Sequence, residues 1–311
     1  MENTETILGQ IEPDITQRLV TRRDAILKGA AVGSSIAAGL AMMSAPIALA
    51  ALSKDAFGQS TPTSVQGVIN FALMLEIFEN EFYKAVLGTS SVTAQNSAFA
   101  GVRASVPASA LPAIRQIQKH EAEHVAFLSA NGAVNTLNLT GASFDFTGGR
   151  GAGNGPFAQA TTDLNFLLLT AQGAEDTGVR AYKGQAPNLQ SNPAVLEAAL
   201  RIHSVEARHA SKIRRLRRMT GATTVKYSGT ITNADPGAGN VSNPAAGAVT
   251  ALGLIYAGED NVTQGGVNVT TLPNLPSGIN VMAAATEAFD EPLTMAQVIA
   301  IVQPFFIPSL S

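Results

Sequence analysis

The sequence has no cysteine and no tryptophan, and only 14% of its 311 residues are charged. The lack of cysteine excludes disulfide frameworks, cysteine-ligated zinc, iron–sulfur clusters and thiol catalysis. The formal net charge of −3 argues against a general nucleic-acid-binding protein. With 46% hydrophobic residues, the composition is typical neither of a disordered chain nor of a coiled coil. The length allows one large domain or two smaller ones.

The first 50 residues have the pattern of an export signal. Arg22 and Arg23 precede an uncharged run at 29–52 that is rich in alanine and glycine. The sequence Ala-Leu-Ala at 48–50 fits a cleavage site, and paired arginines before a mildly apolar stretch are typical of twin-arginine signals. The run is also long enough for an uncleaved membrane anchor. We expect residues 1–50 to be read by the twin-arginine export machinery, which would make the mature protein periplasmic or extracellular.

Four segments have the length and the end signals of long helices: residues 64–87, 110–130, 162–183 and 193–219. Polar N-caps, prolines in the first turn and glycines just beyond the last turn mark their limits. The connection between the second and third helices includes the glycine-rich residues 141–155 and is long enough for a crossover. The sequence therefore predicts a mainly α fold, with a four-helix bundle within residues 51–221.

The composition changes after Gly221. Residues 222–280 are rich in Gly, Asn, Thr and Pro, with alternating runs such as TTVKYSGTIT that predict short strands or ordered loops. A last short helix is expected between Thr294 and Pro304. Apolar runs such as ALGLIYA would be unusual on the surface of a soluble monomer. We therefore expect this C-terminal extension, residues 222–311, to pack on the bundle or to form a subunit contact.

All four histidines of the chain lie in the second and fourth predicted helices. Two of them, His124 and His209, stand three residues after a glutamate, in the sequences Glu-Ala-Glu-His and Glu-Ala-Arg-His. Residues three apart lie on one helix face. Glu121 with His124, and Glu206 with His209, could therefore each bind a metal ion.

The first and third predicted helices supply matching glutamates. Glu76 and Glu175 each lie in an apolar run, where an unpaired carboxylate would be costly. Each is followed seven residues later, on the same face, by a tyrosine, Tyr83 or Tyr182. The chain thus contains an internal repeat, in which a Glu…Tyr helix precedes a Glu-x-x-His helix twice.

Neighbouring residues are weaker candidates for the same site. Glu79 lies one turn from the first of these glutamates and could replace it, although the repeat places Gly178 at the matching position. His120 and His203 each lie one turn from a motif residue and are expected in supporting or surface positions. Glu123 is expected to face solvent.

Charged groups outside this pattern have plainer interpretations. The four arginines within 214–218 suit the negative end of a helix dipole, and nucleic-acid binding is not favoured. The acids of the extension lack the spacing of a calcium loop, so we expect them to be caps or solvated surface groups. They are Glu259, Asp260, Glu287, Asp290 and Glu291.

One glutamate from each of two helices, with Glu-x-x-His from each of the other two, is the di-metal carboxylate pattern of four-helix bundles. On these motifs, over roughly residues 64–220, the chain resembles the ferritin-like superfamily, most closely its exported branch that includes desiccation-related proteins. The resemblance implies six metal ligands: Glu76, Glu121, His124, Glu175, Glu206 and His209. It also implies that Glu121 and Glu206 bridge two ions and that each histidine binds a different one.

The same resemblance implies iron, or alternatively manganese, as the metal and O2 or H2O2 as the small-molecule substrate. The chemistry would be ferroxidase, peroxidase-like or catalase-like. Manganese catalases resemble this bundle but do not keep both Glu-x-x-His motifs, which favours iron. We expect Tyr83 and Tyr182 to donate hydrogen bonds to the carboxylates of the opposite half and so orient them. Electron relay by these tyrosines is the alternative.

A second interpretation is a non-catalytic stress or desiccation-related protein of the envelope, with a structural or vestigial metal. Iron storage in a 24-subunit cage is disfavoured by the extension of about 90 residues after the fourth helix. A smaller homo-oligomer is compatible with the sequence.

Overall fold

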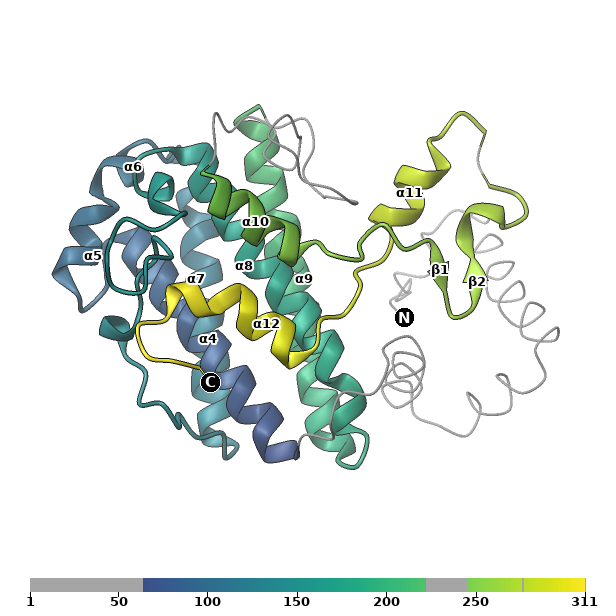
Figure 1. The fold of residues 1–311 in the computed structure, drawn as a ribbon, viewed down its shortest axis with the longest axis horizontal. Coiled ribbons are helices and arrows are strands. Elements are labelled where there is room, and N and C mark those ends of the chain that lie inside the picture. The colour runs from purple at the N-terminus through teal and green to yellow at the C-terminus, as the bar shows by residue number, and fades with distance from the viewer. Residues whose placement is uncertain (1–63, 222–244, 276, 311) are drawn as a thin grey trace, which may run out of the picture. The chain divides into compact units, whose positions relative to one another are not determined.

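The computed structural model describes residues 64–221, 245–275 and 277–310 (Figure 1). The predicted export signal lies outside these ranges, and so does the run TTVKYSGTIT. The described chain is mainly helical, which confirms the prediction of a mainly α fold. The sheet within these ranges pairs only two short antiparallel strands, β1 (Thr263–Gln264) and β2 (Val267–Asn268).

The described structure is built around four long helices: α4 (Val65–Leu87), α7 (Leu111–Ala130), α8 (Leu164–Gln185) and α9 (Pro193–Met219). Helix α4 packs along α7, and α8 packs along α9. The side chains of Ser64 and Asn192 accept N-cap hydrogen bonds, as their positions before the helices predict. Gly88 ends α4 with φ 79°, a left-handed conformation that glycine adopts without strain.

The shorter helices are α5 (Thr93–Ala98), α6 (Ala100–Ala104), α10 (Ala246–Ile255), α11 (Val281–Glu287) and α12 (Met295–Val302). Single 3-10 turns occur at η3 (Gly141–Ser143), η4 (Ala158–Thr161), η5 (Ala186–Leu189), η6 (Val269–Thr271) and η7 (Gln303–Phe305). None of the helices in the described ranges is both long and apolar enough to cross a membrane.

Helix α10 corrects the expectation that residues 222–280 form only strands and loops. Its sequence, AGAVTALGLI, buries Ala248, Leu252 and Ile255, which recur with the spacing of one helix face. Helix α12 lies where the last helix was expected. Thr294 and Gln297 form a capping box at its start, which fixes the position of its first turn.

The connection between α7 and α8 is folded around one carboxylate. Asp145 accepts hydrogen bonds from the backbone N–H groups of Thr147 (3.0 Å), Gly151 (2.9 Å) and Gly153 (3.0 Å). A Cβ atom at Gly155 would lie 2.2 Å from the backbone nitrogen of Gly149, so the close approach of these two segments requires glycine. The glycine-rich residues therefore form an ordered loop.

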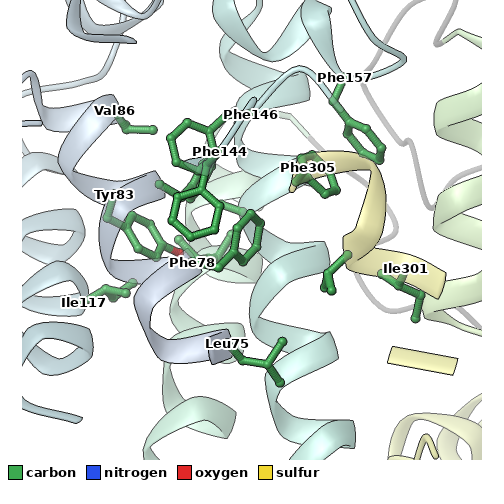
Figure 2. Close-up of a cluster of buried hydrophobic side chains, with 14 of the residues drawn as sticks. Leu75, Phe78, Tyr83, Val86, Ile117, Phe144, Phe146, Phe157, Ile301 and Phe305 are labelled. Atoms are coloured by element: carbon green, nitrogen blue, oxygen red, sulfur yellow. The ribbon is translucent and has the colours of Figure 1, made fainter. Parts of the chain in front are cut away.

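The described part of the C-terminal extension, residues 245–275 and 277–310, is called the C-terminal segment below, and it packs on the bundle. Helices α10 and α12 contact α8. The ring centroid of Phe78 on α4 lies 5.5 to 6.0 Å from the ring centroids of Phe144 and Phe146 in the α7–α8 connection and of Phe305 and Phe306 in the C-terminal segment. Figure 2 shows Phe78 together with the first three of these rings. Edge and stacked contacts of this kind add to the apolar burial. The C-terminal segment is thus part of the main core.

One acid of the extension is buried, which corrects the expectation of a solvated surface group. Glu259 is 2% exposed, and its carboxylate lies 3.3 Å from Nε of Arg180 on α8. Arg180 also donates hydrogen bonds to the carbonyl oxygens of Ile255, Ala257 and Glu291. A buried guanidinium satisfied in this way fixes the C-terminal segment to α8.

The basic run at the end of α9 is likewise only partly a surface feature. Arg217 is fully buried and donates a 2.7 Å hydrogen bond to Gln172. Arg214 forms an ion pair with the buried Asp176, which also accepts a 2.6 Å hydrogen bond from Tyr256. Two of the four arginines are therefore directed into the structure, where they join α9 to α8.

Candidate metal centre

The six carboxylate and imidazole side chains predicted as ligands come together between the four long helices. They are Glu76 from α4, Glu121 and His124 from α7, Glu175 from α8, and Glu206 and His209 from α9. All six are buried, and three of the glutamates are fully so. The Glu-x-x-His spacing places each glutamate and its histidine on the inward face of one helix.

These residues form two groups of four. In each group, every residue offers a ligand atom within 4.8 Å of the others. The first group is Glu76, Glu121, His124 and Glu206; the second is Glu121, Glu175, Glu206 and His209. Glu121 and Glu206 belong to both groups. Two ions could therefore be held side by side, with these two carboxylates between them.

Several buried polar atoms at this site make no well-aligned hydrogen bond among the described residues, although they lie close to oppositely charged groups of the same site. They are Oε1 of Glu121, Oε2 of Glu175, both carboxylate oxygens of Glu206, and Nδ1 of His209. Buried polar atoms without a well-aligned hydrogen bond are costly, and a cluster of them in one place calls for an explanation. Carboxylate oxygens and imidazole nitrogens suit iron and manganese, so the donor set fits such ions.

The histidines are surrounded by acceptors. Nδ1 of His124 lies 3.0 Å from Glu76, 3.2 Å from Glu121 and 3.3 Å from Glu206. Burial alone would lower the pKa of His124, but these carboxylates raise it to about 12. The same balance raises the pKa of His209 to about 12, because its Nδ1 lies 2.8 Å from Glu121 and 3.3 Å from Glu175. Without metal, two imidazolium cations neutralise part of the acidic cluster.

The pKa values of the carboxylates are shifted in different directions. Burial, with the charge of Glu206 next in size, raises the pKa of Glu121 well above its usual value. Burial raises the pKa of Glu175 to about 7. Burial opposes ionisation of Glu206 as well, but the close contacts and positive charges of the two histidines lower its pKa to about 2. The metal-free site therefore retains protons that binding of cations would displace.

The two tyrosines join the halves of the repeat. Tyr83 on α4 donates a hydrogen bond to Glu175 on α8, and Tyr182 on α8 donates one to Glu76 on α4. Burial, followed by the charge of the accepting carboxylate, raises the pKa of each tyrosine well above its ordinary value. Both hydroxyls thus stay protonated, and each fixes the orientation of a carboxylate.

His120 supports the centre from outside. Its Nδ1 lies 2.8 Å from Nε2 of His209, the two rings stack with centroids 5.1 Å apart, and Gln116 lies 2.7 Å from its other nitrogen. His203 is half-buried, and its Nε2 has no hydrogen-bond partner in the described parts of the chain. Glu123 is exposed and lies 3.6 Å from Lys119.

Glu79 is a further buried acid at the edge of the site and belongs to neither group of four. Burial, then the charge of Glu206, raises its pKa well above the usual value. A Cβ atom at Gly178 would lie 3.2 Å from Oε1 of Glu79 and 3.2 Å from Oε2 of Glu206. The glycine at this position of the repeat therefore leaves the room that Glu79 occupies.

A helical bundle with six buried carboxylates and imidazoles in two overlapping groups defines the class of proteins that can hold metal ions between their helices. The family model for the ferritin-like domain matches residues 64–219, which is half of the chain. The protein belongs to this family. No curated protein matches the chain, and no solved structure does.

Proposed function

We propose that the protein binds two iron ions, or alternatively two manganese ions, at this centre and uses them in redox chemistry with O2 or H2O2. The observation that carries the proposal is the sharing of Glu121 and Glu206 by both groups of potential ligands. A pair of such ions, when bound, would supply the electrons that reduce the oxidant. Six protein ligands for two ions leave coordination positions for a small molecule.

The protein's own residues have distinct parts in this function. Glu121 and Glu206 would hold both ions, Glu76 and Glu175 would each hold one, and His124 and His209 would bind different ions. Tyr83 and Tyr182 keep the outer carboxylates in place through their hydrogen bonds. The protons that the histidines and Glu175 release when metal binds are available beside the centre.

The proposal includes the cell compartment. Export through the twin-arginine pathway, which carries folded proteins, would allow the metal to be loaded before translocation. Changing Arg22 and Arg23 to lysine should then block export, and sequencing of the exported protein should give an N-terminus near Ala51. An exported protein that begins at Met1 would contradict cleavage of the signal.

The decisive experiment is elemental analysis of the protein from its native compartment, combined with Fe(II) oxidation and peroxide consumption on the same sample. Two iron or manganese ions per chain, with one peroxide consumed for every two Fe(II) oxidised, would support the proposal. Two ions without turnover would favour the alternative, a stress or desiccation-related protein with a structural metal. A sample free of metal that takes up none on reconstitution would contradict both.

A further inference from the structure

An apolar cavity of about 210 Å³ lies beside the metal centre. Residues of all four long helices line it, among them Ala72, Phe127, Tyr182, Ala199 and Ile202. Among the described residues, the lining contains no charged side chain, and its polar members are Tyr182, Asn131 and Gln185. The cavity thus has the composition of a site for an uncharged molecule, because a charged ligand would lose its hydration without gaining a partner.

Tyr182 connects this cavity to the centre. Its ring lines the cavity, while its hydroxyl donates a hydrogen bond to Glu76, one of the proposed ligands. A more open hollow adjoins the cavity, shares Phe127 and Ile202 with it, and includes His124 in its wall. A molecule in the cavity would therefore lie one side chain away from the metal centre, with an approach from solvent next to it.

The internal repeat shows that two of the side chains around this space are smaller than their counterparts in the first half. Tyr83, which matches Tyr182, is 1% exposed and packs with its centroid 5.2 Å from that of Phe82. The residue before Tyr182 is instead Ala181, which lines the cavity. Alanine thus takes the place of phenylalanine beside the second tyrosine.

The second pair of helices shows the same difference. Ile114 stands seven residues before Glu121 and is buried. Seven residues before Glu206, the chain has Ala199, which lines the cavity. Two bulky side chains of the first half are therefore alanines in the second, and both alanines face the same space.

From this geometry we infer that the cavity beside Tyr182 binds an uncharged, apolar organic molecule, aromatic or aliphatic, of about six to ten carbon atoms. The size follows from the volume, since a dry apolar cavity of about 150 Å³ holds one benzene molecule. The site extends the proposed function without depending on it, because no metal atom takes part in the binding. Its ligand would be either a substrate of the centre or a molecule that controls access to it.

Indole is a suitable probe, because the chain has no tryptophan and the fluorescence excited beyond the tyrosine absorption comes from the ligand alone. We expect saturable binding to the full chain, with and without metal, and at least tenfold weaker binding of the charged analogue indole-3-acetate. Ala181→Phe with Ala199→Ile restores the side chains of the first half, fills the cavity, and should weaken indole binding at least tenfold. Ala126→Ile, on the exposed side of α7, should leave binding unchanged.

Unchanged melting temperatures and metal uptake would show that the variants are folded. If the double variant does not fold, Ala199→Ile alone must weaken binding several-fold. Equal binding to wild type and filled variant, or no binding to the wild type, would overturn the inference. A chain that binds indole but no metal would refute the proposed function and leave this site standing.

Discussion

Nε2 of His209 lies 2.8 Å from Nδ1 of His120, on the side of the ring away from the carboxylates. This contact leaves Nδ1 of His209 directed at Glu121 and Glu175. A partner on the outer nitrogen of a metal-binding histidine fixes the orientation and tautomer of the ring. His120 is therefore a positioning residue for the ring of His209 in the candidate metal centre.

Replacing His120 should weaken metal binding without removing a ligand. We expect His120→Ala to lower the affinity for Fe(II) or Mn(II) about tenfold to a hundredfold, the usual effect of losing such a partner. Titration against a competing chelator measures it. His120→Asn, which retains a polar atom near Nδ1, should restore part of the affinity. His203→Ala is the matched control on α9, and an equal loss in that variant would contradict the positioning role.

The two shared glutamates should control metal-dependent stability. Free metal at a hundredfold excess over its dissociation constant should raise the free energy of unfolding of the wild type by about 2.7 kcal/mol. Glu121→Gln with Glu206→Gln should abolish that rise, because both ions lose a ligand. Thermal melts with and without metal test this. Glu79→Gln lies outside both groups and should retain the rise; a rise in the double variant as well would place the metal elsewhere.

The metal-free protein should lose stability as the pH increases above about 6.5, the ordinary value for histidine. The pKa of His124 and of His209 is raised to about 12 in the fold, so their contribution is complete below 6.5 and declines as the pH approaches 12. Metal must displace these protons, so the metal-induced rise in melting temperature should grow with pH over the same interval.

Melts between pH 6 and pH 9, together with proton release measured by an indicator dye on metal addition, check this dependence. A variant with both histidines changed to glutamine should show a flatter profile without metal. A wild-type protein whose metal-free stability increases over this interval would contradict the assignment of the protons.

The packing of the C-terminal segment on α8 should depend on the side chain of Arg180. Arg180→Met leaves Glu259 buried without its ion pair, and the carbonyl groups of Ile255, Ala257 and Glu291 lose their donor. Breaking a buried pair costs about 3–5 kcal/mol, which urea denaturation can detect. The exposed pair of Arg201 and Glu197 provides the control, since Arg201→Met should cost at most about 1 kcal/mol. An equal loss of unfolding free energy in the two variants would show that Arg180 does not anchor the C-terminal segment to the bundle.

The long helices and the six clustered residues could be predicted because their signals are local. Caps and turns set the helix ends, and the spacing of Glu121 and His124 already places both on one face. Repetition of the pattern across the chain made the prediction specific. The sequence could also weigh Glu76 against Glu79, because Gly178 stands where a second acid of the repeat would otherwise be.

The C-terminal segment was harder to predict because its structure depends on distant partners. Nothing near Glu259 in sequence shows that Arg180 lies opposite to it in the fold. The helix α10 is stable because its apolar face packs on α8, and its small residues do not signal that contact in advance. Both features are therefore decided by tertiary contacts with α8, which is distant in sequence.

The folded loop around Asp145 has a consequence for what the glycine-rich segment can bind. Loops that hold phosphate present several backbone N–H groups to an anion that arrives from solvent. Here the N–H groups of Thr147, Gly151 and Gly153 already surround a carboxylate of the same chain. A nucleotide would have to expel an anion that is covalently attached and cannot diffuse away. The backbone N–H groups of this segment are therefore already occupied by the Asp145 carboxylate. The glycines allow the loop to close around that carboxylate and do not form a site for an external anion.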